Sequence, residues 1–344
     1  MKSTTFGLDI GTTAIRAVWL SKDNNRYSYE ASAVAPTPTP GIQSESPLDH
    51  QELAKYINKL ITDAKIGTRE VSIALPERQV FTKVIDMPVI SEKELSSAIY
   101  WEAEQYIPAP LDTMTLDWSI LRRPKESISQ DKMQVLLVAA PLQLVKRYQS
   151  IIEMAGLSLA AVETEVLSII RSVLNVNRAV TSLVMHMGAL STSLCIVKEN
   201  IMVFNYSVPL GGIAMTRAIA ADFGFTPTQA EEYKRTYGLS DQHFGGKVGT
   251  AIQPILTELM SEVRKAMVFY NEKYREESPI SQILLTGASA TLPGIDLYFA
   301  QHIGIETVIA NPWKLLEIQQ VPAAIQPSGA EYSVALGLAL KEYE

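Results

Sequence analysis

Cysteine is nearly absent from this sequence of 344 residues, since Cys195 is the only one. An intramolecular disulfide and a cysteine-rich metal site are therefore excluded, as is usual for proteins of a reducing compartment. A membrane-spanning run of roughly 20 apolar residues is also missing, because the longest nearly apolar stretch, Val135–Val145, contains Pro141. The first residues lack the apolar region of a secretion signal. We expect a cytoplasmic protein that reaches a membrane only through a partner.

Positive charge is in deficit as well. The 30 lysine and arginine residues are outnumbered by 37 aspartate and glutamate residues, which gives a formal net charge of −7. This balance argues against nonspecific binding to nucleic acid. With 47% hydrophobic and 19% charged residues, the composition is that of a folded globular protein. A chain of this length is expected to form two lobes rather than one core.

Apolar periodicity predicts alternating strands and helices. The first two strands, Thr5–Ile10 and Ala14–Leu20, flank a glycine turn and read as a hairpin. The elements expected next are an extended loop over 35–47, a helix over 53–64, a strand over 71–75, a helix after the Ser91–Glu94 capping box, strands over 115–121 and 133–139, a helix over 142–154, a strand over 159–162 and a helix over 166–174.

A second hairpin begins at Ser182 and repeats the pattern of the first one. Phe6–Thr13 and Leu183–Leu190 both show an apolar strand that runs into glycine and a turn. This repetition predicts two related halves. A strand-glycine-strand pattern is also common in unrelated hairpins, so the repetition leaves chance as an alternative.

The first hairpin turn is a candidate phosphate loop. Gly11 permits close approach to the backbone, while Thr12 and Thr13 offer amide and hydroxyl donors. Asp9 would repel phosphate, so its expected role is to hold a magnesium ion, through water. Arg16 can add a cation nearby. The alternative is an ordinary hairpin in which Asp9 caps the turn.

Further glycines and one charged pair extend the candidate site. Gly188 lies in the second hairpin turn, and Gly211 with Gly212 precedes a predicted helix, whose amino terminus can attract phosphate. Each of these glycines can equally be a simple turn residue. Glu231 and Lys234 share a helix face and can bracket a ribose and the edge of adenine, or form only a surface ion pair.

A fourth junction follows a predicted buried strand over 281–286. Gly287 and Ala288 stand where a flat base or a sugar can approach the backbone. Together, the hairpin turns, the paired glycines, the Glu-x-x-Lys pair and this junction support one another more than any of them does alone.

The order of these features resembles the actin and heat-shock chaperone superfamily. Within it, the sequence resembles the PilM family of type IV pilus assembly proteins, which is related to FtsA. The segments that carry the resemblance are Val71–Pro76, Ser91–Leu95, Trp101–Pro108, Val135–Pro141, Val208–Gly212, Ala230–Lys234, Leu292–Gly294, Ala310–Pro312 and Ala335–Ala339. They extend over essentially the whole chain.

The resemblance implies a two-lobed actin-like α/β fold, built from duplicated ribonuclease-H-like halves with an inserted α/β subdomain in the first lobe. The implied divisions are a first lobe of residues 1–83 with about 156–178 and the C-terminal helix 331–344, an inserted subdomain of 84–155, and a second lobe of 179–330 with a helical subdomain at about 222–280.

The resemblance also implies a function. The protein would be a cytoplasmic ATP-binding scaffold of the pilus inner-membrane platform, recruited to the inner face of the membrane by the short cytoplasmic peptide of a PilN-like protein. Other platform proteins and self-association into a ring would complete its partners. ATP and magnesium are the implied cofactors. The residues carried over are Asp9, Gly11, Thr12, Thr13, Arg16 and Gly188 for phosphate and magnesium, and Gly211, Gly212, Glu231, Lys234, Gly287 and Ala288 around the nucleoside.

Two positions depart from the superfamily pattern. His186 replaces a second metal-orienting aspartate, and Ala288 replaces a second glycine. A neutral imidazole is a poor ligand for hydrated magnesium, so we expect slow or absent hydrolysis by a protein that still binds ATP. Glu163 or Glu165 is the candidate that positions a catalytic water, unless these acids only cap the following helix.

Two other functions remain open from the sequence. The first is an active ATPase or small-molecule kinase on the same fold, against which His186 argues. The second is an FtsA-like division protein, which needs a terminal amphipathic anchor that is not expected after Lys341.

Overall fold

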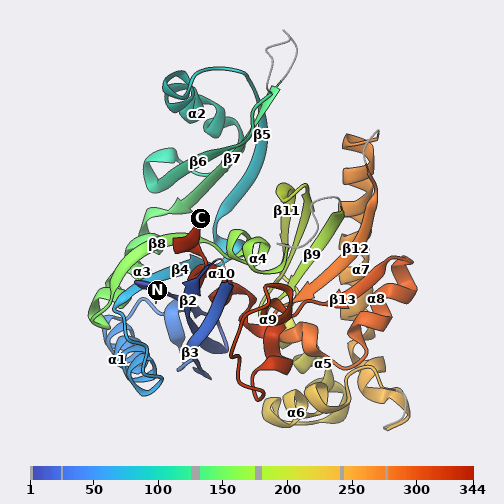
Figure 1. Ribbon diagram of the computed structural model, residues 1–344. Coiled ribbons are helices and arrows are strands. Elements are labelled where there is room, and N and C mark those ends of the chain that lie inside the picture. The colour runs from blue at the N-terminus through green and yellow to red at the C-terminus, as the bar shows by residue number, and fades with distance from the viewer. Residues whose placement is uncertain (1–2, 25, 125–131, 175–179, 241–243, 276–277) are drawn as a thin grey trace.

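The computed structural model describes residues 3–24, 26–124, 132–174, 180–240, 244–275 and 278–344. Its strands form three sheets, with helices packed against them (Figure 1). The predicted lobe boundary at residues 178 and 179 lies outside the described residues. No helix within the described ranges is both long and apolar enough to cross a membrane.

The first sheet has five strands in the order β3-β2-β1-β4-β8. These strands are β1 (Thr5–Ile10), β2 (Ala14–Asp23), β3 (Arg26–Pro36), β4 (Glu70–Leu75) and β8 (Ser158–Thr164). β1, β2 and β3 form an antiparallel meander, whereas β4 pairs in parallel with β1 and with β8. The hairpin predicted around Gly11 is confirmed, and β3 is a strand that the sequence analysis missed.

The second sheet also has five strands, in the order β11-β10-β9-β12-β13. These strands are β9 (Thr181–Met187), β10 (Thr192–Lys198), β11 (Ile201–Val208), β12 (Ile280–Thr286) and β13 (Glu306–Ile309). Their directions repeat those of the first sheet, with an antiparallel meander followed by two parallel strands. This shared order and direction confirms the duplicated, two-lobed α/β fold.

One face of the first sheet packs on α1 (Pro47–Asp63) and α3 (Leu142–Met154). Buried residues of both helices, including Ile57 and Ile151, share a core with Leu8 of β1. α1 begins at Pro47, earlier than the predicted residue 53, because proline suits the first turn of a helix. The loop expected over 35–47 is correspondingly shorter.

The other face of the first sheet packs on α4 (Glu165–Val173) and α10 (Ser333–Ala339). Glycine allows this close approach. A Cβ at Gly7 of β1 would collide with the backbone of α10, and a Cβ at Gly337 of α10 would collide with the backbone of Ser168 in α4. A segment distant in the sequence therefore completes the first half.

A separate sheet projects from the first half, at the top of Figure 1. Its strands, in the order β5-β7-β6, are β5 (Phe81–Pro88), β6 (Met114–Arg122) and β7 (Lys132–Pro141), and α2 (Glu92–Tyr106) packs on it. The predicted capping box of Ser91 and Glu94 opens α2. Because α3 belongs to the core of the first sheet, we propose that the inserted unit spans residues 81–141 rather than 84–155.

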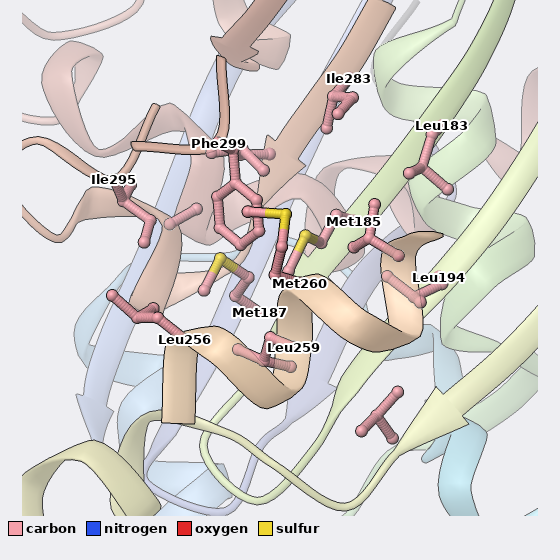
Figure 2. Packing of buried hydrophobic residues seen from close by; sticks show 14 of the residues in the cluster. Leu183, Met185, Met187, Leu194, Leu256, Leu259, Met260, Ile283, Ile295 and Phe299 are labelled. Carbon is pink, nitrogen blue, oxygen red and sulfur yellow. The ribbon is translucent and has the colours of Figure 1, made fainter. Parts of the chain in front are cut away.

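The helices of the second half share one core with the second sheet. They are α5 (Gly212–Phe223), α6 (Pro227–Tyr237), α7 (Lys247–Lys273) and α8 (Ile295–Ile303), and the short α9 (Pro312–Leu315) follows β13. Figure 2 shows the core of this half, where Met260 of α7 and Phe299 of α8 meet Met185 and Ile283 of the sheet. The core of each half thus anchors the strands that flank its hairpin turn, β1 and β2 in the first half and β9 and β10 in the second.

Candidate nucleotide site

The turn between β1 and β2 is held by its own backbone. The N–H of Gly11 donates to the carbonyl oxygen of Ala14 at 3.1 Å, and the hydroxyl of Thr37 donates to the carbonyl oxygen of Gly11 at 2.7 Å. Thr12 and Thr13 at the tip are exposed. Their amide and hydroxyl groups are therefore accessible to a ligand.

Asp9 and Arg16 lie opposite each other on this hairpin. Burial raises the pKa of Asp9 to about 6, and the Arg16 guanidinium opposes part of that rise. Arg16 is 8% exposed and forms an ion pair with Glu331. Its guanidinium also lies 6.0 Å from the ring centre of Tyr332. A cation is thus fixed beside the candidate phosphate loop.

His186 occupies the position in β9 that Asp9 occupies in β1. Its Nδ1 lies 2.9 Å from the hydroxyl of Thr286. Burial, with a contribution from Arg16, lowers the pKa of His186 to about 4. The imidazole is therefore neutral at pH 7. Arg16 of the first half therefore acts electrostatically on Asp9 and on His186 of the second half.

The glycines of the second half contact one another. The N–H of Gly212 donates to the carbonyl oxygen of Gly188 at 2.9 Å, and the hydroxyl of Ser289 donates to the same oxygen at 3.2 Å. A Cβ at Gly211 would lie 2.6 Å from the carbonyl oxygen of Ala189, and a Cβ at Gly212 would collide with Ser289. Only glycine permits this approach of three segments.

Lys234 is buried beside these glycines, with 6% exposure. Its ammonium donates to the carbonyl oxygen of Gly212 at 3.0 Å, to the hydroxyl of Thr216 at 2.9 Å and to the carboxylate of Glu231 at 2.6 Å. Glu231 stays 44% exposed. A simple surface ion pair is therefore wrong for Lys234, which holds Glu231 at the edge of the glycine cluster.

Gly287 links this cluster to His186. Its φ is +86°, a conformation that side chains rarely adopt, and a Cβ there would lie 3.0 Å from Cε1 of His186. Its N–H donates to the carbonyl oxygen of Ala330 at 2.8 Å. Ala288 follows and is exposed. The predicted residues of the second half thus lie together, and Ala330 is followed by Glu331, the partner of Arg16 in the first hairpin.

Glu163, the first of the two candidate catalytic acids, forms an ion pair with Arg171. Its two carboxylate oxygens accept from Arg171 at 2.6 and 2.9 Å, so this carboxylate is engaged in a bidentate ion pair. Glu165 is the acid that interacts electrostatically with Asp9. Burial, and then the charge of Asp9, raise the pKa of Glu165 to about 8. Its carboxylate accepts from the N–H of Glu77 at 3.0 Å. We therefore no longer propose Glu163 as the catalytic group.

Sequence reasoning assigned no individual role to three side chains of this region, namely Thr216, Ser289 and Glu331. Thr216 lies one helical turn after Gly212 and Ser289 two residues after Gly287, so proximity to the motifs was an available signal. No local sequence signal pointed to Glu331, because it lies 315 residues from its partner Arg16.

A family model described as type IV pilus assembly protein PilM matches residues 7–343. The chain belongs to this family. The match includes both hairpin turns and the Glu331 region, and it confirms the resemblance to PilM that the sequence motifs indicated.

Solved structures agree with PilM membership. The PilM-PilN type IV pilus biogenesis complex is similar with a TM-score of 0.85 and 29% identity, and it covers 100% of both chains. MreB5 of Spiroplasma citri bound to ADP has a TM-score of 0.54 and 14% identity, covers 98% of this chain and 96% of its own, and shows the actin-like fold alone.

A curated protein is similar as well. The cell division protein FtsA of Streptococcus pneumoniae serotype 2 (strain D39 / NCTC 7466) is 24% identical over 347 residues. The alignment covers 89% of this chain and 75% of FtsA. This likeness agrees with the relation between PilM and FtsA.

Proposed function

We propose that this protein is an ATP-binding scaffold of the type IV pilus inner-membrane platform, and that it binds the cytoplasmic N-terminal peptide of a PilN-like membrane protein. The observation that carries the proposal is the likeness to the PilM-PilN complex along the whole chain, at 29% identity. The neutral His186, in place of a second acid, favours holding ATP over hydrolysing it.

A groove between the inserted sheet and the first half suits an extended peptide. Its volume is about 480 Å³, and its walls come from β6 and β7 on one side and from α4 and the C-terminal segment on the other. The apolar residues that line it are Leu121, Leu136, Leu167, Ile170, Leu174 and Leu340. Peptide capture relies on a few buried apolar anchors, which such walls can receive.

β6 offers the peptide a second mode of attachment. It is an edge strand of the inserted sheet, and an extended peptide can add to such an edge through backbone hydrogen bonds. The other edge strand of this sheet is β5, which contacts β11 of the second half, so β6 is the better candidate.

ATP is proposed to bind where the two halves meet. Phosphates would contact Thr12, Thr13 and Gly188, while the Glu231–Lys234 pair would bracket the nucleoside. Glycine at positions 11, 211, 212 and 287 lets neighbouring segments pack closely around the proposed site, and Ala288 is exposed beside them. The fit is supported by the Arg16 Nε, which is buried without a hydrogen-bond partner among the described residues.

Magnesium would neutralise phosphate charge when bound. The described part of the chain contains no cluster of three His, Cys, Asp or Glu side chains suited to a metal ion. Asp9 would therefore hold the ion through water, and the triphosphate would supply the remaining oxygen ligands. Ring self-association, other platform partners and recruitment to the inner face of the cytoplasmic membrane are proposed from the family alone.

The test of peptide binding compares two substitutions by calorimetry with a synthetic PilN-like N-terminal peptide, with and without ATP and magnesium. Leu121→Arg places a charge on the apolar part of the groove wall and should weaken binding at least about tenfold. Leu48→Arg is the matched control, because Leu48 is 74% exposed on α1. Absence of peptide binding to the parent would contradict the function, whereas equal binding by Leu121→Arg would contradict only the groove.

A further inference from the structure

Arg16 is held by a residue from a distant part of the chain. Its Nη2 donates to the carboxylate of Glu331, 315 residues away. The side chains are only 10% and 15% exposed. A buried charge that loses its partner is strongly unfavourable. Whatever separates this pair must therefore offer Arg16 another anion.

The guanidinium of Arg16 still has donor capacity. Its Nε is buried and makes no hydrogen bond among the described residues, although arginine offers a fork of five N–H donors that matches phosphate. Arg16 lies opposite Asp9 on the hairpin and acts electrostatically on His186 of the other half. An anion that enters between the two hairpin turns therefore meets Arg16.

Glu331 sits in the segment that crosses from the second half to the first. The preceding residue, Ala330, accepts from the N–H of Gly287 at 2.8 Å. The residue before that, Gly329, is packed so closely on Asn311 that a Cβ would collide with its side chain. α10 begins two residues after Glu331. Neighbouring residues thus tie the Gly287 junction of one half to the hairpin of the other.

We propose that Glu331 and the terminal phosphate of ATP compete for Arg16, so that Glu331 weakens triphosphate binding and couples it to the crossing segment of residues 326–332. The inference rests on the proposed binding of ATP. Carboxylate and phosphate both form charge-assisted hydrogen bonds with guanidinium, and two anions held on one cation repel each other. ATP carries more phosphate charge than ADP, so Glu331 opposes ATP more strongly. Glu331 is a positioning residue that acts through Arg16.

The test measures ATP and ADP affinities by calorimetry for the parent, Glu331→Gln and Glu331→Asp, each also in an Arg16→Gln background. Glu331→Gln should tighten ATP binding about fivefold, or about 1 kcal/mol, and tighten ADP binding less. Glu331→Asp keeps the charge and should stay near the parent. In the Arg16→Gln background, Glu331→Gln should change nothing, because the contested cation is gone.

A second measurement needs no variant. Hydrogen exchange of the parent should be faster in residues 326–332 with ATP than with ADP, since the triphosphate competes more strongly with Glu331 for Arg16. Weaker ATP binding by Glu331→Gln, an equal gain for both nucleotides, a gain that persists without Arg16, or equal exchange with both nucleotides would each overturn the inference. A parent that binds no nucleotide would overturn the proposed ATP binding as well, which separates the two failures.

Discussion

Single buried side chains set the chemistry of the candidate site. Burial raises the pKa of Asp9 to about 6 and lowers that of His186 to about 4. Near pH 7 the matched positions 9 and 186 of the two hairpins therefore offer one ionised carboxylate and one neutral imidazole. A hydrated metal ion would find a single anionic partner there, which suits binding better than the alignment that phosphoryl transfer requires.

Replacement of His186 by aspartate tests this interpretation. We expect the parent to release phosphate well below about one turnover per second, the low end of ordinary enzymes. His186→Asp restores a second carboxylate and should speed phosphate release, measured together with ATP affinity in the same buffer. His186→Asn has the shape of aspartate without its charge and should stay as slow as the parent. Fast release by the parent, or no change in either quantity with aspartate, would refute the role of His186.

Glu165 gives a prediction for pH. A free glutamate has a pKa of 4.5, whereas burial and the charge of Asp9 raise that of Glu165 to about 8. Between pH 4.5 and about 8, the folded state therefore binds more protons at Glu165 than the unfolded state does. The contribution of Glu165 to the free energy of unfolding falls as pH rises through this window. Glu165→Gln removes the titration.

The melting temperature of Glu165→Gln should therefore rise relative to the parent between about pH 5 and pH 8. Glu104→Gln, at an exposed position of α2, is the control and should show no such trend. A constant difference between Glu165→Gln and the parent across this pH range would mean that Glu165 is ionised throughout.

Helices and strands pack closely where a glycine lies in the contact. The contact of α10 with α4 allows this to be tested. A Cβ at Gly337 would collide with the carbonyl oxygen of Ser168 in α4. Gly337→Ala should lower the free energy of unfolding by about 1–3 kcal/mol, the usual effect of overpacking, measured by denaturant titration. Gly249→Ala is the matched control, because its Cβ meets Leu239 at an ordinary 3.5 Å. Equal stability of both variants would show that α10 shifts without cost.

The sequence predicted those elements that have strong apolar periodicity or distinct caps, such as α2 with its capping box. It missed β3, because only Ala31 and Ala33 of that strand are buried and small side chains leave little periodic signal. In the candidate site, the glycine junctions were visible as motifs. The pairing of Arg16 with Glu331 was not, since no local pattern connects residues so far apart.

At the scale of the whole molecule, the proposed inserted unit of residues 81–141 can be removed as a test. Phe81 of β5 pairs with Ala139 of β7, so the two ends of the inserted unit lie side by side. Replacement of residues 82–138 by a short Gly-Ser turn should leave the two main cores intact, because neither contains a residue of this segment, although Leu136 is lost from a smaller cluster between the halves.

This shortened protein should still bind ATP in calorimetry and should lose the PilN-like peptide. Thermal melting and circular dichroism serve as the check on folding. Full peptide affinity in the folded, shortened protein would exclude the groove beside β6, and loss of ATP binding would mean that the nucleotide site depends on the inserted unit.

The packing of α10 has a consequence for synthesis on the ribosome. β1 and β2 are translated early, yet Val18 and Leu20 are covered by Leu336 and Leu340. The strands of the second sheet all lie between residues 181 and 309, uninterrupted by strands of the other sheets. The second half therefore has its complete sheet while the first half still shows an apolar face to solvent. During this interval of translation, that face is open to chaperones and to neighbouring nascent chains.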